Sequence, residues 1–397
     1  MKGGIRKMRT RVLRYSSALL LTLLALPVLR IGWASSAPPS DEFFLYIGSS
    51  KSERTPSKGI YTYRFKASTG EIASPGLVKV LDPAFLAIHP NHRFLYAVNQ
   101  SPDAEASGVT SFTIDRKTGG LTLLNQVSSH GANPVYVLLD KTQKYALVAN
   151  YFGHSVATFP LLADGRLGEA AAVVTYTESG PNHPERAKGV FPHSIDLSSD
   201  NRFAIVTGLG VDKLFVYKFD PSSGSLIANH PPFFALPPGA GPRHIAFDPK
   251  GKFVYTMSEV KGIVTVLSYH AADGSLSEVQ SISSLPKDFK GENASAEIEV
   301  SPDGKFLYAS NRGPDSIALF AVDSGKGTLT PIEIVSSHGK FPNNFSFDPT
   351  GSFLFVANEH SDNVVVFRVD RKTGRLTPTG QELQVPCPQN IVFLATQ

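Results

Sequence analysis

The sequence predicts an all-β protein, a seven-bladed β-propeller with four antiparallel strands in each blade. Three observations predict this fold class. A glycine turn recurs at a nearly constant spacing, and stretches of alternating apolar and polar residues fill the chain between the turns. The first unit also lacks its opening strand, and one additional opening strand follows the last unit at the C-terminus.

The recurring turn consists of glycine, any residue and an aliphatic residue. It occurs seven times, and successive glycines are 46 to 59 residues apart. Glycine allows the positive φ that a tight turn of this kind requires. Seven copies at one period predict seven units of a repeat, with turns at Gly70, Gly119, Gly165, Gly224, Gly274, Gly327 and Gly374.

Each unit also carries two strand marks. The opening strand starts with a proline that an apolar residue follows three places later, and Ser295 replaces the proline in one unit. These prolines are Pro83, Pro134, Pro192, Pro242, Pro342 and Pro388. The second strand starts with an aromatic residue: Phe44, Phe94, Tyr145, Phe203, Phe253, Phe306 or Phe353.

One unit, residues 241 to 276, illustrates how four strands arise. Apolar residues alternate with others through Ile245 and Phe247, and again through Phe253 and Tyr255, which indicates half-buried strands. Asp248-Pro249-Lys250-Gly251 between them is typical of a turn, in which aspartate caps the backbone and glycine supplies positive φ. The unit is therefore a four-stranded meander.

The two ends of the chain predict how the ring closes. No opening strand precedes Phe44-Leu45-Tyr46, whereas a spare one runs from Pro388 to Leu394. A C-terminal strand that completes the first sheet closes a ring and removes open sheet edges. Two β-sandwiches would explain neither the incomplete first unit nor the spare strand. We expect one propeller domain over residues 42 to 396.

The N-terminal segment has the pattern of a secretory signal. Residues 1 to 37 hold seven basic residues and no acidic one, with an apolar run from Ala18 to Leu29 and small residues after it. An uncleaved anchor is the alternative, although the run is short for a spanning helix. We expect removal of the signal, a periplasmic or secreted protein, and no stable membrane association afterwards.

Charge and cysteine usage exclude several classes of function. Without the first 37 residues, 31 basic residues face 34 acidic ones, so charge gives no case for binding nucleic acid or a membrane surface. The single cysteine, Cys387, excludes an internal disulfide. Acidic residues are scattered and the common cofactor motifs are absent, so we expect no metal and no cofactor.

Candidate site residues come from two aligned positions of the repeat. The start of the opening strand and the end of the second strand meet at one face of each blade, because these neighbours are antiparallel. The first position is Ala84, Val135, His193, Arg243, Ala296, Asn343 or Gln389, and the second is Ser50, Gln100, Tyr151, Leu209, Glu259, Arg312 or Glu359. We expect four of these, His193, Arg243, Glu259 and Arg312, to form a catalytic group around the axis.

The residue types suit an oxyanion-bearing or anionic small molecule. Guanidinium groups match carboxylate and phosphate oxygens, and an imidazole can exchange protons near neutral pH. The alternative is a structural ion pair between Arg243 and Glu259, which would satisfy both buried charges. Further residues beside these positions are predicted to contact substrate: Asn150, Tyr151, His154, Asn311 and Glu359. A long polar insertion over residues 168 to 191 is predicted to form a rim or an ordinary surface loop.

The repeat Pro-x-x-Ile-x-Phe-Asp/Ser-Pro-Asp/Lys-Gly-Lys-Phe-x-Tyr and the opening Leu45-Tyr46-Ile47-Gly48-Ser49 resemble the seven-bladed lactonase family. That family includes bacterial propeller-type 6-phosphogluconolactonases and the fungal carboxy-cis,cis-muconate cyclase. The resemblance covers about residues 42 to 396. It implies a histidine, two arginines and a glutamate at the active site, which carry over to His193, Arg243, Glu259 and Arg312.

This chain departs from the family pattern at three places. Phe191 stands where the family often has histidine, Gly208-Leu209-Gly210 where it usually has Asp-Leu-Gly, and Asn343 where it has arginine. We expect an exported hydrolase that opens a small sugar lactone or an anionic sugar derivative, of the 6-phosphogluconolactonase type. The alternatives are a non-catalytic propeller that binds a protein or glycan and a cycloisomerase of the carboxymuconate type.

Overall fold

The computed structural model describes residue 1 and residues 40 to 51, 56 to 180 and 189 to 396. The chain divides into two units, Met1–Pro39 and Ser40–Gln397. Apart from Met1, the predicted signal over residues 1 to 37 lies outside the described residues. Within the described part, no helix is long and apolar enough to cross a membrane.

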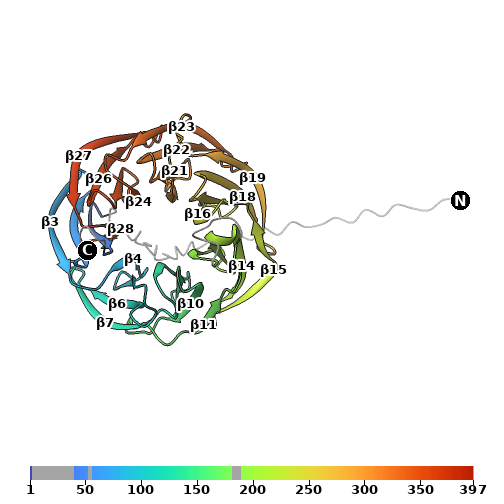
Figure 1. Cartoon of the computed structure of the whole chain (residues 1–397), viewed down its shortest axis with the longest axis horizontal. Coiled ribbons are helices and arrows are strands. Elements are labelled where there is room, and N and C mark those ends of the chain that lie inside the picture. Colours follow the sequence, from blue (N-terminus) through green and yellow to red (C-terminus); the bar gives the residue numbers. More distant parts are fainter. Residues whose placement is uncertain (2–39, 52–55, 181–188, 397) are drawn as a thin grey trace. The chain divides into compact units, whose positions relative to one another are not determined.

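The unit from Ser40 onward is a ring of seven four-stranded antiparallel sheets, as predicted (Figure 1). The first three sheets, each from its innermost strand outward, are β28 (Pro388–Ala395), β1 (Glu42–Ser49), β2 (Ile60–Lys66), β3 (Glu71–Val78); β4 (Pro83–Ile88), β5 (Phe94–Asn99), β6 (Gly108–Ile114), β7 (Leu121–Ser128); and β8 (Pro134–Leu139), β9 (Tyr145–Asn150), β10 (Ser155–Pro160), β11 (Ala172–Thr175).

The other four sheets follow the same order. They are β12 (Pro192–Leu197), β13 (Phe203–Gly208), β14 (Lys213–Asp220), β15 (Ser225–Ala235); β16 (Pro242–Phe247), β17 (Phe253–Ser258), β18 (Ile263–His270), β19 (Ser275–Ser283); β20 (Ser295–Val300), β21 (Phe306–Asn311), β22 (Ser316–Val322), β23 (Leu329–Ser336); and β24 (Pro342–Phe347), β25 (Phe353–Asn358), β26 (Asn363–Val369), β27 (Leu376–Gln384). We number these sheets blades 1 to 7 in the order given.

The C-terminal strand closes the ring. β28 pairs with β1 in antiparallel register, with Leu45 opposite Phe393 and Tyr46 opposite Val392. The innermost strands then contact one another all the way round, including β24 with β28 and β28 with β4. The prediction that the spare strand completes the first sheet is confirmed.

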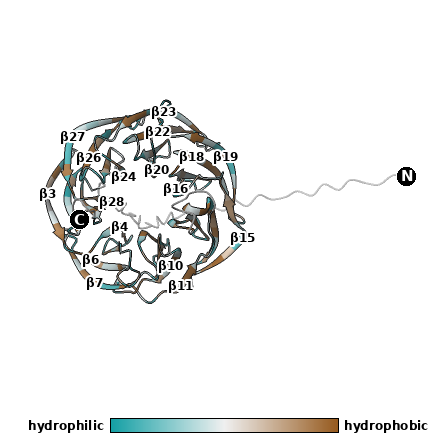
Figure 2. Cartoon of the chain, viewed as in Figure 1, coloured by the Kyte–Doolittle hydropathy of each residue, from teal (hydrophilic) through white to brown (hydrophobic). Residues whose placement is uncertain are grey.

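The hydrophobic core is divided among the seven junctions between blades. Each buried cluster draws side chains from two neighbouring blades; one of them joins Phe65 of blade 1 to Phe355 of blade 7. Hydrophobic residues accordingly occur in every blade of the ring (Figure 2). No blade buries its apolar faces alone, so the repeat is stable only as a closed set.

The turn glycines form close contacts between neighbouring blades. Each has positive φ and packs against the aromatic residue that opens the second strand of the preceding blade. A Cβ at Gly165 would lie 2.3 Å from the ring of Phe94, and one at Gly70 would lie 3.1 Å from Phe353, the contact across the closing junction. The glycine is therefore required both for the turn conformation and for this close approach.

The innermost strands carry an irregularity that matters for the site. In every blade the register shifts by one residue just after the opening proline or serine, as between Pro242 and Ile245. Such a bulge opposes two residues to one on the partner strand and redirects their side chains. The residue before the proline has positive φ in six blades: Asp82, Asn133, Phe191, Gly241, Phe341 and Cys387.

Two details differ from the sequence prediction. Leu209, expected at the end of a second strand, lies in the short 3-10 helix η1 (Leu209–Val211) and is buried. The insertion predicted over residues 168 to 191 includes β11, the outer strand of its blade, so part of it completes the sheet. Residues 181 to 188 of that insertion lie outside the described residues.

Candidate active site

A polar cavity lies at the centre of the ring, between the starts of six innermost strands. Its volume is about 160 Å³. The lining residues are Ala84, Phe85, Gln100, Val135, His193, Arg243, His244, Arg312, Asn343, Asn344, Glu359 and Gln389. Six of the seven residues that follow the opening proline or serine contribute to this wall, so the first aligned position of the repeat converges as expected.

A backbone hydrogen bond brings the second aligned position to the same place. The N–H of Glu259, after β17, donates to the carbonyl of Gly241, just before β16, over 2.8 Å. The corresponding bond joins Tyr151 to Asn133 and Glu359 to Phe341. In these three blades the end of the second strand therefore lies beside the start of the innermost strand. Gln100, Arg312 and Glu359 are the second-position residues that line the cavity.

Arg243, Glu259 and Arg312 form one buried ion cluster. Glu259 Oε2 lies 3.4 Å from Arg243 Nε and 3.3 Å from Arg312 Nη2. The side chain of Arg243 is 5% exposed, that of Glu259 is 6% exposed and that of Arg312 is 11% exposed. The ion pair of Arg243 with Glu259, named above as the alternative to a catalytic group, is present, but the one carboxylate of Glu259 pairs with two guanidinium groups. The cluster keeps a positive charge in a site largely removed from water, where charge interactions are strong.

Asn343 holds the two guanidinium groups side by side. Its Oδ1 accepts from Arg243 Nη2 over 2.9 Å and from Arg312 Nη1 over 3.1 Å, while its Nδ2 donates to Gln389 over 2.7 Å. The ring of Phe341 packs under Arg312, with the guanidinium carbon 4.7 Å from the ring centre. Burial, and next the charge of Arg312, lower the pKa of Arg243 to about 10. Arg243 remains a cation at neutral pH.

His193 lies among aromatic rings at the cavity wall. The ring of Tyr151 is 5.4 Å away, and the ring of His244 is 5.1 Å away. Its buried Nδ1 has no hydrogen-bond partner beyond its own backbone among the described residues. Burial, followed by the nearby Arg243, His244 and Arg312, places the pKa of His193 well below its ordinary value, so the imidazole is neutral at pH 7.

His244 is a second imidazole in the wall and was not predicted. Its Nδ1 lies 2.9 Å from Glu297 Oε1, and its Nε2 lies 3.4 Å from Arg243 Nη1. The Nδ2 of Asn344 donates to the other oxygen of Glu297. Burial lowers the pKa of His244, and the charge of Glu297 partly opposes that effect.

The reason His244 was missed is the bulge in β16. Strict alternation would direct His244 away from the side that Arg243 faces. Because the bulge lies between Pro242 and Ile245, two successive side chains reach the cavity. The same holds for Asn343 and Asn344 on β24, where the shift lies between Pro342 and Asn344. Bulges are over-represented beside active sites, but no feature of the sequence of a single unit predicts a bulge.

The residues predicted to contact substrate divide into three cases. Glu359 lines the cavity, and Tyr151 lies beside it against His193. His154 is set back from the wall, because its ring packs on Phe191 at 4.5 Å and its Nδ1 accepts from the Phe191 N–H. Asn150 and Asn311 do not reach the cavity.

Asn150 and Asn311 are buried inside their blades, and this corrects the prediction that they bind substrate. Asn150 Nδ2 donates to Ser129 O and Ser155 Oγ over 2.8 and 3.0 Å. Asn311 Nδ2 donates to Ser284 O, and its Oδ1 accepts from Ser284 and Ser295. These amides hold strand ends to neighbouring loops, and neither lines the cavity.

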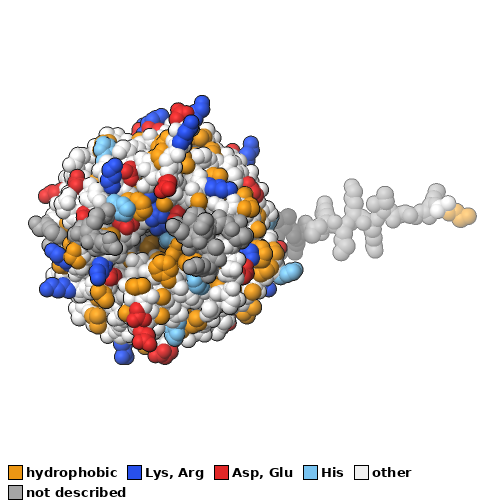
Figure 3. Space-filling model, viewed as in Figure 1, with side chains coloured by type: hydrophobic (Ala, Val, Ile, Leu, Met, Phe, Trp, Pro, Cys, Tyr) orange, Lys and Arg blue, Asp and Glu red, His pale blue; other side chains and the backbone are white. Residues whose placement is uncertain are grey.

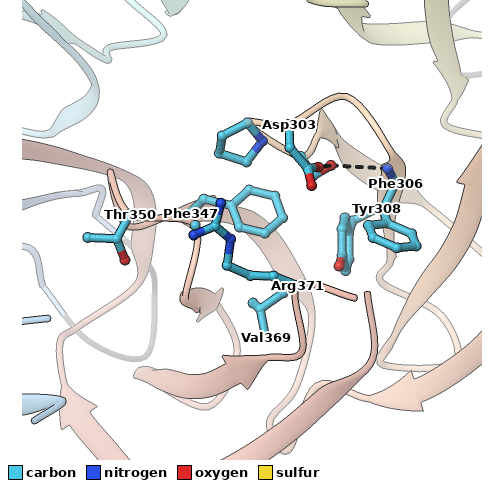
Figure 4. Close-up of a pocket in the computed structure, with 10 residues that line it drawn as sticks. Asp303, Phe306, Tyr308, Phe347, Thr350, Val369 and Arg371 are labelled. Atoms are coloured by element: carbon cyan, nitrogen blue, oxygen red, sulfur yellow. Dashed lines mark hydrogen bonds between the residues drawn. The ribbon is translucent and has the colours of Figure 1, made fainter. Parts of the chain in front are cut away.

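Two other hollows in the described structure lack this chemistry. The hollow in Figure 4, between blades 6 and 7, has a volume of about 20 Å³, room for roughly one water. A larger groove of about 600 Å³ along β19 and β23 is mainly apolar, with Lys287 and Glu333 as its charged residues. It contains neither an imidazole nor paired guanidinium groups.

The described residues offer no metal site, since no group of three or more His, Cys, Asp or Glu side chains is placed to hold an ion. Figure 3 shows basic and acidic side chains interspersed on the viewed face, without a field of one sign.

Comparisons with known proteins agree with the geometry. Residues 44 to 393 match the family model described as Lactonase, 7-bladed beta-propeller. The chain is 37% identical over 293 residues to a 6-phosphogluconolactonase of Bacillus subtilis (74% of this chain, 82% of the relative) and 33% identical to one of Formosa agariphila (77% and 86%). It is also similar to the structure of a periplasmic gluconolactonase of Pseudomonas aeruginosa, PpgL, with a TM-score of 0.84 and 33% identity over 90% of this chain and 100% of that one.

Proposed function

The chain belongs to the seven-bladed β-propeller lactonase family, and on that premise we propose that it hydrolyses a neutral sugar lactone of the gluconolactone type. The observation that carries the proposal is the pair of guanidinium groups, Arg243 and Arg312, beside a neutral imidazole in one small cavity. This set supplies the two things that ester hydrolysis needs, a stabiliser for negative oxygen and an acceptor for a proton.

The proposed reaction follows from these roles. The lactone carbonyl oxygen faces Arg243 or Arg312, and water attacks the carbonyl carbon, so negative charge develops on oxygen next to a guanidinium group. Glu259 keeps both guanidinium groups oriented. Two imidazoles, His193 and His244, line the wall as acceptors for the proton of the water, and His193 is the one predicted from the sequence.

The charge balance favours a neutral substrate. Glu359 adds a second carboxylate beside the cluster of Arg243, Glu259 and Arg312, so the two guanidinium charges are balanced. Among the described residues that line the cavity there is no lysine. A phosphate dianion would have to be desolvated without a cation of its own, which is unfavourable. The cavity, about 160 Å³, is also below the roughly 300 to 1,000 Å³ of sites for drug-sized ligands and suits a single sugar ring.

We also propose that the protein is exported. The basic, apolar and small-residue order of residues 1 to 37 supports this proposal, as does the similarity to a gluconolactonase whose name calls it periplasmic. An exported enzyme meets unphosphorylated sugar lactones more readily than cytosolic sugar phosphates. Location and charge balance thus point to the same substrate class.

The test is a hydrolysis assay with glucono-1,5-lactone and its 6-phosphate, each corrected for spontaneous opening. We expect kcat/KM for the unphosphorylated lactone to equal or exceed that for the phosphate. A strong preference for the phosphate would overturn the substrate class, and no acceleration of either would overturn the hydrolase. Two alternatives have their own outcomes: turnover of a carboxymuconate would indicate a cycloisomerase, and inactivity on all three a binding propeller.

A further inference from the structure

We infer that His244, oriented by Glu297, is the base that takes the proton from the attacking water. The inference rests on the proposed lactone hydrolysis and assigns to it one catalytic residue, His244, and one positioning residue, Glu297. Both lie outside the four residues that the sequence pattern selected. Hydrogen bonds join them to buried groups on β16, β20 and β24.

Glu297 is held by three donors. Its Oε1 faces His244 Nδ1 at 2.9 Å and accepts from the backbone N–H of Ile298 over 3.0 Å, while its Oε2 accepts from Asn344 Nδ2. The backbone N–H and the amide N–H₂ can only donate, and a carboxylate can only accept. The hydrogen between Glu297 and His244 therefore sits on Nδ1 of the imidazole.

This tautomer leaves a lone pair on Nε2 of His244. The Nε2 lies 3.4 Å from Arg243 Nη1, at the long limit of a hydrogen bond and therefore weakly engaged. The proton acceptor is thus next to the guanidinium group proposed to receive the oxyanion. A water that attacks a carbonyl bound at Arg243 would be within reach of that lone pair, the arrangement that general base catalysis requires.

His193 lacks such support. Its Nδ1 has no partner beyond its own backbone among the described residues, so no carboxylate fixes its tautomer or stabilises its protonated form. The two rings are 5.1 Å apart and lie edge to face. Of two imidazoles in one wall, one is oriented by a carboxylate and the other is not, and orientation by a third group is what marks a catalytic base.

The proton and electron pairs balance over one turnover. Water oxygen forms a bond to the carbonyl carbon, the carbonyl π pair moves to oxygen beside Arg243, and the water proton passes to His244 Nε2. The tetrahedral intermediate then re-forms the carbonyl and breaks the bond to the ring oxygen. That oxygen takes the proton from Nε2 and leaves as a hydroxyl, so the product is the open hydroxy acid and His244 is neutral again.

The test compares His244→Asn, Glu297→Gln and His193→Asn in the whole protein. Asparagine places an amide where Nδ1 was, so His244→Asn keeps a donor to Glu297 but has no group at Nε2. We expect kcat with glucono-1,5-lactone to fall about 10²-fold or more in His244→Asn, with KM changed by less than about fivefold. His193→Asn, an identical change on the neighbouring strand, should lower kcat less.

Glu297→Gln separates a catalytic role from a structural one through pH. The acid limb of kcat/KM reports the pKa of the base in the free enzyme. His244 is surrounded by Arg243, Arg312, His193 and Tyr136, with Glu297 as the carboxylate bonded to it. Loss of the Glu297 charge removes the effect that raises the pKa of His244, so the acid limb should move to lower pH. A purely structural role would lower the rate without moving the limb.

A second readout is independent of activity. Nitrogen-15 spectra of labelled histidine should show the Nδ1–H tautomer for His244 in the wild type and its loss in Glu297→Gln. A His244→Asn enzyme as fast as the wild type, or the Nε2–H tautomer in the wild type, would overturn this inference and leave the hydrolase intact. A wild type inactive on lactones would instead overturn the proposed function, and this inference with it.

Discussion

Two sectors of the cavity wall share one backbone and differ in chemistry. Blades 2 and 3 contribute only neutral side chains, whereas the blades from β12 onward add imidazole, guanidinium and carboxylate groups. The neutral side chains are those of Ala84, Phe85, Gln100 and Val135. In both sectors the innermost strand starts at the same position of the repeat and carries the same register shift. The backbone supplies equivalent positions all round the ring, and the side chains alone decide which of them carry chemistry.

The difference also shows how the two sectors must be stabilised. The side chains of the neutral sector need only to pack against one another. In the charged sector, each buried charge without a partner would lower the free energy of unfolding by several kcal/mol. Glu259 and Asn343 perform that compensation by each contacting Arg243 and Arg312. The charged sector is therefore coupled, and a change in it should affect stability as well as rate.

Removal of the shared carboxylate should have the largest effect. In Glu259→Gln two buried guanidinium groups are left without their counter-ion, which typically lowers the free energy of unfolding by about 3 to 5 kcal/mol. Urea unfolding followed by circular dichroism measures it. Asp164→Asn, which breaks the exposed pair with Arg166, is the matched control and should leave the unfolding free energy unchanged. Equal effects of the two changes would refute the coupled sector.

Removal of one guanidinium group should come next. Arg243→Met keeps an unbranched side chain in the wall but loses the guanidinium group, the proposed oxyanion donor, so we expect kcat to fall about 10²- to 10³-fold. Steady-state hydrolysis of glucono-1,5-lactone gives the value. Arg166→Met, the same change at a side chain that is 53% exposed, should keep the wild-type kcat. A full-speed Arg243→Met enzyme would mean that the charged sector does not act on the carbonyl.

A change in the neutral sector should have the smallest effect. Val135→Thr keeps the shape of the wall and adds one hydroxyl, so kcat and KM should stay within about twofold of the wild type. The same assay measures both constants. A tenfold change would show that this wall takes part in the chemistry, and the contrast between the sectors would fail.

The fold was predictable because the same sequence features recur in all seven repeat units. The turn glycines, the opening prolines and the aromatic starts of the second strands lie where expected, and Pro388 begins the strand that closes the ring. The close packing of each turn glycine on the preceding blade also explains why the period is so regular, because an altered turn would lose contact with a neighbour.

The site was predictable in part. Aligned positions selected four candidate residues that the structure brings together, because equivalent residues of a closed ring converge at its axis. These candidates are His193, Arg243, Glu259 and Arg312. The aligned positions did not identify His244 or Glu297, because alternation assigns neighbouring residues to opposite faces and the bulge overrides it. Asn150 and Asn311 show the converse: their place beside the aligned positions predicted contact with substrate, but their amides bond to loops next to the strand ends.

The most direct test of the account is a crystal structure with glucono-1,5-lactam, which keeps the ring carbonyl but resists hydrolysis. The account predicts that the lactam occupies the central cavity, with its carbonyl oxygen roughly 3 Å from a guanidinium nitrogen of Arg243 or Arg312 and its carbonyl carbon facing His244. A lactam bound in the groove along β19 and β23, or in the cavity with its carbonyl turned to Ala84 and Val135, would contradict it.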